Sequence, residues 1–197
     1  MNNEFKPIFV ENETIIFKPL TNNNSQEFRA IENGLLAIFS DKQVLHFHPE
    51  KELKSVSDAA TYVLGTLIGY GAKIHYNHFI FEKKTNRVIG IIEIRSPLGV
   101  LSKYEFLEKI SEQEPILKNT WVVEYYLNPE YWGRGIISLC LSLVIDRILI
   151  NPATTISAFT QTENIRSKRI LDKHKFIHFI TYEKGLEHWI KIKNMTV

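Results

Sequence analysis

The stretch WVVEYYLNPEYWGRGI, residues 121–136, decides the fold predicted for this chain. It opens with β-branched and aromatic residues, which are typical of a strand. Two glycines then flank Arg134, and the apolar run behind them predicts a helix from Gly135 to about Ile150. Glycine lets backbone amides approach a ligand, and a helix start adds N–H groups without partners. This order predicts a site for an anion such as phosphate or pyrophosphate, although a bare turn has the same pattern.

Along the rest of the chain, hydrophobic periodicity predicts a mixed α/β sheet with helices able to cover its faces. Strands are expected at residues 14–20, 78–82, 87–95, 121–127, 154–160, 176–183 and 188–193, the second and third forming a hairpin. Helices are expected through Phe28 and Ile38, at residues 55–70, 135–150 and 163–173, and as a short helix within the connection 96–119.

The helix at residues 55–70 illustrates how a buried face is predicted. Ser55 or Ser57 is expected to cap its start. Apolar residues at helical spacing predict that one face packs on the sheet, and these residues are Val56, Ala60, Val63, Leu64 and Leu67.

Length and composition limit the class of protein. A chain of 197 residues, 44% hydrophobic and 23% charged, is expected to form a single domain over residues 1–197. Lysine and arginine total 24 against 22 acids, and this balance does not favour a nucleic-acid partner. The apolar stretch 136–150 is too short to span a bilayer, and the start MNNEFKPIFV lacks the pattern of a secretion leader. We therefore expect a cytoplasmic protein without a membrane partner.

Together with SAFTQTENIRSKRILDKHKF, residues 157–176, the opening stretch resembles the Gcn5-related N-acetyltransferase (GNAT) superfamily. The resemblance is to the branch of ribosomal-protein N-terminal acetyltransferases of the RimJ and RimL type, and it is strongest over residues 121–176. It implies a mostly antiparallel central sheet of about six to seven strands flanked by helices. It also implies an acetyl-coenzyme A dependent enzyme that acetylates a primary amine, on a small molecule or a protein N-terminus, as a monomer or homodimer.

The resemblance assigns the glycine loop to the pyrophosphate of acetyl-coenzyme A. The family pattern is Gln/Arg-x-x-Gly-x-Gly/Ala, which residues 130–135 match except at Glu130. The loop residues implied to contact the cofactor are Trp132, Gly133, Arg134, Gly135 and Ile136.

Two further segments are implied to contact acetyl-coenzyme A. A bulge in the strand 121–127 would free backbone N–H groups for the thioester at Tyr126, Leu127 and Asn128. Asn164 and Ser167 resemble the family's Glu-Asn-x-x-Ser element, which contacts the pantetheine and phosphate portion. Asn164 could instead only cap its helix.

Direct acetyl transfer needs a base for the attacking amine and a donor for the departing thiolate. Glu124 is the candidate base because it lies in an apolar strand, but the branch often has glycine there and glutamate where this chain has Val122. A water relay or a merely solvent-facing Glu124 stays open. Many superfamily members use a tyrosine as the donor where this chain has Leu171, so Ser167 is the candidate acid, with a helix-cap hydroxyl as the alternative.

Other functions are compatible with parts of this sequence. A non-catalytic module binding coenzyme A or another nucleotide is the main alternative, since Leu171, Glu124 and Lys175 depart from the family. A dinucleotide fingerprint would need a third glycine near Ser138. His46 and His48 lack a third ligand, so no metal is expected, and Cys140 is expected to pack in the core. Segments 40–54 and 96–119 are expected to border the acceptor pocket.

Overall fold

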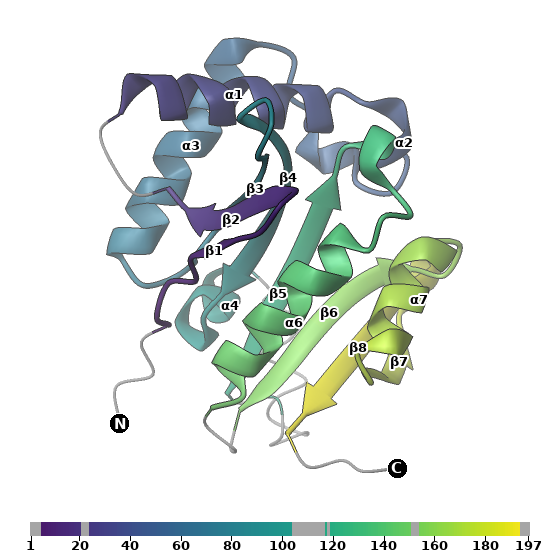
Figure 1. Cartoon of the computed structure of the whole chain (residues 1–197). Coiled ribbons are helices and arrows are strands. Elements are labelled where there is room, and N and C mark those ends of the chain that lie inside the picture. Colours follow the sequence, from purple (N-terminus) through teal and green to yellow (C-terminus); the bar gives the residue numbers. More distant parts are fainter. Residues whose placement is uncertain (1–4, 21–23, 104–116, 118, 151–153, 194–197) are drawn as a thin grey trace.

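A computed structural model describes residues 5–20, 24–103, 117, 119–150 and 154–193, and shows one sheet with helices on both faces (Figure 1). The sheet has the order β1-β2-β3-β4-β5-β6-β8-β7, and neighbours are antiparallel except for the parallel pair β5 and β6. The strands are β1 Val10–Glu11, β2 Ile15–Pro19, β3 His78–Glu82, β4 Arg87–Arg95, β5 Thr120–Leu127, β6 Thr155–Gln161, β7 Ile177–Thr181 and β8 Leu186–Ile192.

The expected α/β class and mostly antiparallel sheet are confirmed, but the described residues form eight strands instead of six to seven. The additional strand is β1, which pairs with β2 through Val10 and Glu11. Two residues are too few to show the alternation from which strands are predicted, so this edge strand left no signal in the sequence.

Helices cover the sheet unequally on its two faces. The α-helices are α1 Ser25–Phe39, α2 Lys42–Leu45, α3 Val56–Gly71, α4 Pro97–Lys103, α6 Ile136–Ile148 and α7 Ile165–Lys173, and the short 3-10 helices are η1 Pro49–Lys51, η3 Pro129–Tyr131 and η4 Glu183–Gly185. One core joins α1 and α3 to a face of β3 and β4, and a second core joins α6 to the opposite face. None of the helices within the described ranges combines the length and apolarity needed to cross a membrane.

The face that α3 buries differs from the predicted one. Ser55 caps the helix as expected, with its Oγ accepting from the Asp58 N–H, but the buried positions are Ala59, Val63, Thr66 and Gly69. Three residues of the predicted face are exposed: Val56 by 50%, Leu64 by 57% and Leu67 by 38%. The helix is apolar around most of its circumference, so sequence spacing did not determine which side would meet the sheet.

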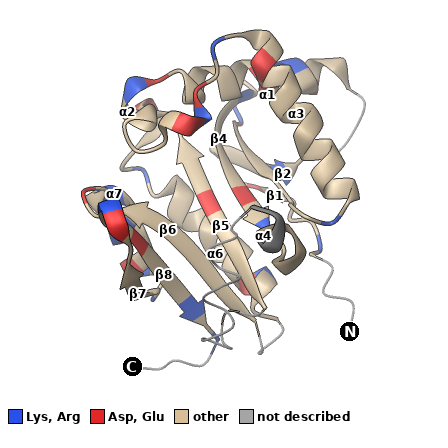
Figure 2. Ribbon diagram, turned by 180° about the vertical axis from the view of Figure 1, so that it is seen from behind, with Lys and Arg blue, Asp and Glu red and all other residues tan. Residues whose placement is uncertain are grey.

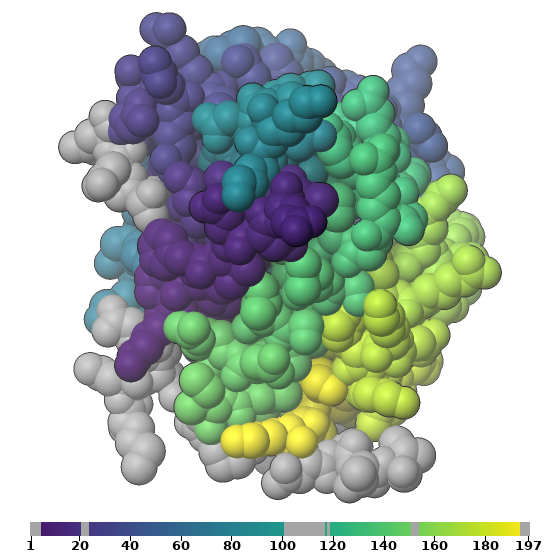
Figure 3. Space-filling model, in the orientation of Figure 1, coloured from purple at the N-terminus to yellow at the C-terminus, as the bar shows by residue number. Residues whose placement is uncertain are grey.

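Helix α6 lies between the strand pair β5–β6 and the start of the chain. Its inner face buries Cys140, whose thiol is fully enclosed, and burial raises the pKa of that thiol to about 12. On its outer side Arg147 Nη1 donates to the Lys6 carbonyl at 2.9 Å. Figure 3 shows the N-terminal segment (purple) lying against α6 (green). Cys140 is thus a packing residue, as the sequence predicted.

The connection after β4 begins with a helix. The short helix expected within residues 96–119 corresponds to α4. The Ser96 Oγ accepts the Gly99 N–H at 3.2 Å, and the Val100 N–H donates to the Ser96 carbonyl at 2.9 Å. The apolar residues expected further along this connection, Tyr104, Phe106, Leu107 and Ile110, lie outside the described residues.

Candidate functional site

Strand β5 is paired differently along its two edges. It pairs with β4 at six consecutive positions, from Val122 to Leu127, without a shift of register. Its recorded parallel pairing with β6, within the described residues, covers Thr120, Trp121 and Val122 and stops there. The bulge expected in this strand is therefore not seen toward β4. Strands β5 and β6 instead diverge after Val122, and this divergence opens the sheet just before the glycine loop.

The direction of the β5 amides follows from one hydrogen bond. The Asn128 N–H donates to the Ile89 carbonyl at 2.8 Å, on the β4 side. Because amides alternate along an antiparallel pair, the Tyr126 N–H also faces β4, whereas the N–H groups of Leu127 and Tyr125 face the opening. Of the three positions expected to offer a backbone donor, Leu127 alone therefore directs its amide toward the opening.

The glycine loop presents a helix start with open space around it. Gly133 and Gly135 have φ angles of 76° and 74°, in the left-handed region that glycine adopts without strain. Gly135 precedes the first residue of α6, and Leu139 is the residue whose N–H returns to the Gly135 carbonyl, at 3.0 Å. The N–H groups of residues 136–138 therefore have no acceptor in the preceding turn of the helix. A Cβ placed on either glycine would meet nothing within 4 Å.

Two residues expected to contact an anion, Trp132 through its backbone N–H and Arg134 through its charge, are held within the loop itself. Arg134 Nη2 donates to the Glu130 carbonyl at 2.7 Å, and its guanidinium lies 4.8 Å from the centre of the Tyr131 ring. The Trp132 indole N–H donates to the Leu127 carbonyl at 2.8 Å, and the Trp132 backbone N–H donates to the Pro129 carbonyl at 3.1 Å. Trp132 thus closes the end of β5, and its backbone N–H is already used within the loop.

A pocket of about 760 Å³ lies beside this loop. The start of α2 forms one wall, and the glycine loop and the start of α7 form the others. Arg166 stands at its edge with its guanidinium 4.7 Å from the centre of the Trp132 ring. The residues that line the pocket are Asp41, Gln43, Arg87, Asn128, Pro129, Glu130, Trp132, Gly133 and Arg166.

Across the opening, the start of α7 faces β5. Asn164 caps the helix, since its Oδ1 accepts from the Ser167 N–H at 3.1 Å, so the capping role weighed for Asn164 is confirmed. The Ser167 Oγ lies 2.7 Å from the Tyr125 hydroxyl oxygen. Burial raises the pKa of Tyr125, so this hydroxyl keeps its proton as a hydrogen-bond donor. No local pattern singles out Tyr125, because its partner lies 42 positions away.

Leu171 and Lys175 depart from the family pattern near α7, and the structure shows how each residue is accommodated. Leu171 is fully buried in the core and offers no hydroxyl group. Lys175 has a φ angle of 60°, so the chain adopts at this residue the left-handed backbone that glycine favours. The Phe176 N–H donates to the Leu171 carbonyl at 3.0 Å, which closes the helix end despite the substitution.

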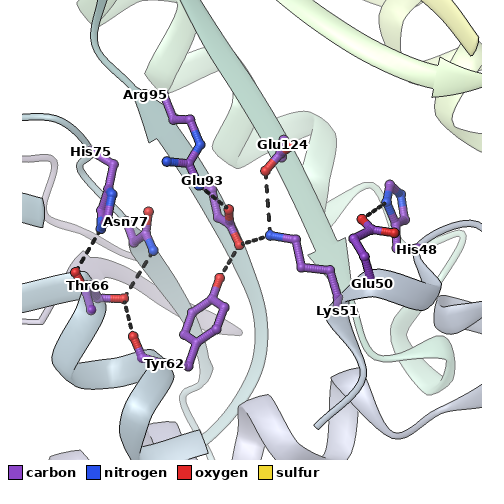
Figure 4. Close-up of polar contacts among 11 residues, drawn as sticks. His48, Glu50, Lys51, Tyr62, Thr66, His75, Asn77, Glu93, Arg95 and Glu124 are labelled. Atoms are coloured by element: carbon purple, nitrogen blue, oxygen red, sulfur yellow. Dashed lines mark hydrogen bonds and ion pairs between the residues drawn. The ribbon is translucent and has the colours of Figure 1, made fainter. Parts of the chain in front are cut away.

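Glu124 lies on the face of the sheet opposite α6, in a cluster of charged side chains. Figure 2, which views the sheet from the side opposite α6, shows acidic positions (red) in the middle of β4 and β5. Glu93 and Glu124 are direct neighbours across β4 and β5. The Lys51 ammonium lies between them, 2.7 Å from Glu93 Oε1 and 3.6 Å from Glu124 Oε2 (Figure 4). The side chain of Glu124 is 18% exposed and that of Glu93 is 3% exposed.

Further groups enclose the buried carboxylate of Glu93. The Tyr62 hydroxyl donates to Glu93 Oε1, and Arg95 Nη2 lies 3.8 Å from Glu93 Oε2. Burial raises the pKa of Tyr62 well above its usual value, and the Glu93 charge raises it further. Glu124 is therefore the more accessible carboxylate of the pair, while Glu93 is surrounded by donors. Sequence reasoning missed Lys51, Tyr62, Glu93 and Arg95, which carry no motif.

His46 and His48 have different surroundings. His46 is exposed, whereas the His48 ring packs edge-on to Tyr126 with centroids 5.0 Å apart. Burial lowers the pKa of His48, although the nearby Glu50 and Glu124 charges oppose this effect. Within the described ranges, no group of three or more His, Cys, Asp and Glu side chains could hold a metal ion.

Comparison with known proteins identifies the class. A family model described as the acetyltransferase (GNAT) domain matches residues 26–177, so the chain belongs to this family of acetyltransferases. A comparison with curated protein sequences found no match.

Solved structures of the same fold are similar over nearly the whole chain. A ribosomal-protein-S5-alanine acetyltransferase from Vibrio fischeri has a TM-score of 0.68 at 15% identity, over 95% of this chain and 98% of that one. RimL, a ribosomal L7/L12 alpha-N-protein acetyltransferase in complex with coenzyme A, has a TM-score of 0.66 at 13% identity, over 92% of this chain and 95% of that one. An aminoglycoside acetyltransferase in complex with coenzyme A has a TM-score of 0.62 at 10% identity, over 91% and 95%. At these identities the likeness establishes the fold.

Proposed function

We propose that this chain, as a single domain, is an acetyl-coenzyme A dependent N-acetyltransferase that transfers the acetyl group directly to a primary amine. The amine belongs to a small molecule or to a protein N-terminus. The observation that carries the proposal is the divergence of β5 from β6 after Val122, directly before the glycine loop at the start of α6. Family membership supports it, as does the presence of coenzyme A in two structures of the same fold.

The residues at the opening fit the chemical groups of acetyl-coenzyme A. A pyrophosphate needs clustered N–H donors and free space, which Gly133, Gly135 and Ile136 supply at the helix start. Trp132 and Arg134 shape this loop, and Arg166 adds a positive charge beside it. When bound, acetyl-coenzyme A supplies the activated acetyl thioester.

The strand side of the opening fits the remaining length of this ligand. The Leu127 N–H faces the opening between Tyr126 and Asn128, whose own N–H groups face β4. Asn164 and Ser167 border the opposite side, at the start of α7. The chain thus offers backbone donors along one wall and a capped helix start along the other.

Acetyl transfer needs one proton acceptor and one proton donor, and the two faces of β5 supply a candidate for each. An amine attacks only when it is unprotonated, so a carboxylate or a water that it holds must take the proton. Glu124 is the accessible carboxylate on the acceptor face. On the other face, Ser167 donates to the departing thiolate. This role requires Tyr125 to be the donor to the Ser167 Oγ, 2.7 Å away, which leaves the Ser167 proton directed elsewhere. A thiol has a pKa of about 8.5, so Tyr125, whose pKa is raised by burial, stays protonated beside the departing thiolate.

Thermal unfolding with and without acetyl-coenzyme A tests the cofactor assignment, with NAD and ATP as controls. Ligand at about a hundred times its dissociation constant stabilises the native state by roughly 2.7 kcal/mol. For a chain of this size the expected rise in Tm is about 2 to 4 °C. A rise with NAD or ATP instead, or no rise at all, contradicts the assignment.

Release of free coenzyme A thiol separates the enzyme from a non-catalytic binding module. With a panel of amines, including peptides with free N-termini and small polyamines, the enzyme is expected to release thiol only when an acceptor is present. Binding of acetyl-coenzyme A without acceptor-dependent release would favour the non-catalytic module, for which the buried Leu171 in place of a tyrosine is the structural argument.

A further inference from the structure

We propose that Lys51 is a positioning residue of the acceptor side: its ammonium group occupies the cation site between Glu93 and Glu124, so that an acceptor amine is not trapped there in protonated form. The inference rests on the proposed function and deepens it. It assigns a role to the charged cluster of Lys51, Glu93 and Glu124, which neither the sequence motifs nor the cofactor site explains.

The contacts of Lys51 describe a site built for an ammonium ion. Its Nζ donates to Glu93 Oε1 at 2.7 Å and lies 3.6 Å from Glu124 Oε2. The same atom lies 4.9 Å from the centre of the Tyr126 ring and 5.9 Å from those of Phe39 and Tyr62. Two carboxylates and aromatic rings are the groups that stabilise a partly desolvated ammonium ion. Figure 4 shows the Lys51 side chain extending toward Glu93 and Glu124, with its nitrogen in contact with both carboxylates.

The segment that carries Lys51 also reaches the cofactor side. Lys51 ends η1, which follows α2 by a few residues, and the start of α2 lines the pocket beside the glycine loop through Asp41 and Gln43. Segment 40–54 was expected to border the acceptor pocket, and its Lys51 lies against the candidate base, Glu124. An amine that approaches Glu124 from this face therefore enters the field of the same cluster.

Charged and polar groups face the Lys51 ammonium from every element packed around it. Glu93 and Arg95 project from β4, Glu124 from β5, Tyr62 from α3, and His48 and Glu50 precede Lys51 on its own segment. Without Lys51, Glu93 and Glu124 would lose their shared cation, and Arg95 would remain beside Glu93, with its Nη2 3.8 Å from Glu93 Oε2. A substrate ammonium would then be able to take the place between the two carboxylates that the Lys51 ammonium occupies.

Lys51 itself shows what this position does to an amine. Burial acts to lower the pKa of Lys51, but attraction by Glu93 and Glu124 outweighs it, and the pKa is raised above its ordinary value. An acceptor amine bound in the same place would likewise stay protonated, and a protonated amine has no electron pair with which to attack a thioester. The internal lysine keeps this place filled while Glu124 remains accessible to solvent.

Steady-state kinetics of Lys51→Met test the inference against two matched variants. We expect kcat to fall by about tenfold or more, the effect of one or more pKa units on the unprotonated fraction, and KM for the amine to fall as well. KM for acetyl-coenzyme A should stay unchanged. Lys51→Arg keeps a cation and should resemble the wild type. Lys54→Met removes a lysine that is 76% exposed and should change neither constant.

The double variant Lys51→Met/Glu93→Gln keeps the test decisive if the single variant folds poorly, because it removes a buried cation together with its partner charge. It should recover most of the lost kcat, since Glu124 then faces the acceptor without a second carboxylate. Equal kcat values for the single and double variants would overturn the inference. So would an unchanged kcat and amine KM in Lys51→Met.

A binding measurement separates this inference from the proposed function. Methylammonium chloride, compared with equal sodium chloride, should raise the Tm of Lys51→Met and leave those of the wild type and the double variant unchanged. Absence of turnover by the wild type with every amine would contradict the proposed function alone, and the methylammonium measurement would still decide whether the cation site exists. No rise in the Tm of Lys51→Met would overturn it.

Discussion

The two edges of β5 show how one strand serves both stability and function. Toward β4 it pairs at six positions and carries packed side chains on both faces of the sheet. Toward β6 three pairs are recorded among the described residues, and the strands then part, leaving backbone amides directed into an opening. The fold therefore obtains an opening for a ligand where β5 is not paired with β6, while the edge paired with β4 keeps the strand in place. We call the edge of β5 toward β4 the closed side and the edge toward β6 the open side.

The largest expected effect is on stability and comes from His78 in β3, on the closed side. His78 is fully buried; its Nε2 accepts the Ile8 N–H at 3.0 Å, so Nδ1 carries the proton given to the Tyr76 carbonyl at 3.0 Å. Burial lowers the pKa of His78 to about 4 from 6.5. The unfolded chain therefore binds more protons than the native state between these values, and stability falls as pH decreases from 6.5 toward 4. The loss attributable to His78 is about 3 kcal/mol.

Urea unfolding across this pH range measures the effect, with His78→Asn as the comparison. The variant should be less stable near neutral pH but lose less stability on acidification. His188, whose pKa burial lowers to about 4, is present in both proteins and contributes equally to both slopes. Parallel pH profiles for the two proteins would show that protonation of His78 does not limit the stability of the closed side.

The next effect concerns the open side, where Gly135→Asp should lower the affinity for acetyl-coenzyme A by about 100-fold or more, which corresponds to roughly 2.7 kcal/mol. The new carboxylate would face the amides of the helix start, and the φ angle of 74° disfavours any side chain. Calorimetric titration measures the affinity, and circular dichroism checks the fold. Gly65→Asp, at a helix position with no atoms near an added Cβ, adds the same charge as a control and should bind normally. Equal affinities for the two variants would exclude the loop as the pyrophosphate site.

The smallest effect concerns the contact that spans the opening. Tyr125→Phe should lower kcat by about tenfold, the worth of one hydrogen bond to the group that donates to the thiolate, with little change in the Kd of acetyl-coenzyme A. Ser167→Ala should lower kcat at least as much. Because the two hydroxyls act in series, the double variant should be no slower than Ser167→Ala. Additive losses would mean that Tyr125 and Ser167 contribute separately, and unchanged kcat values would leave the pair as an anchor for α7.

Comparison of particular elements shows where prediction from the sequence succeeded. The hairpin of β3 and β4 and the order β5, glycine loop, α6 match the prediction within a few residues, since periodicity and glycine act locally. Local patterns do not report which neighbours an element meets. The buried face of α3 therefore differs from the predicted one apart from Val63, and the expected bulge is not seen toward β4, where β5 pairs without a shift of register. The opening expected beside this strand lies where its pairing with β6 ends.

The sequence by itself determined the family, the strand and helix that flank the glycine loop, and the left-handed turn positions, because each depends on residues adjacent in the chain. Only the tertiary structure decided which side chains meet. Lys51 and Glu93 are 42 positions apart, and so are Tyr125 and Ser167. Their contacts arise from strand register and from the placement of α7 and η1 against the sheet. Such contacts have no local sequence pattern. A polar residue that will form one cannot be distinguished from other polar residues until the sheet brings its partner within hydrogen-bond distance.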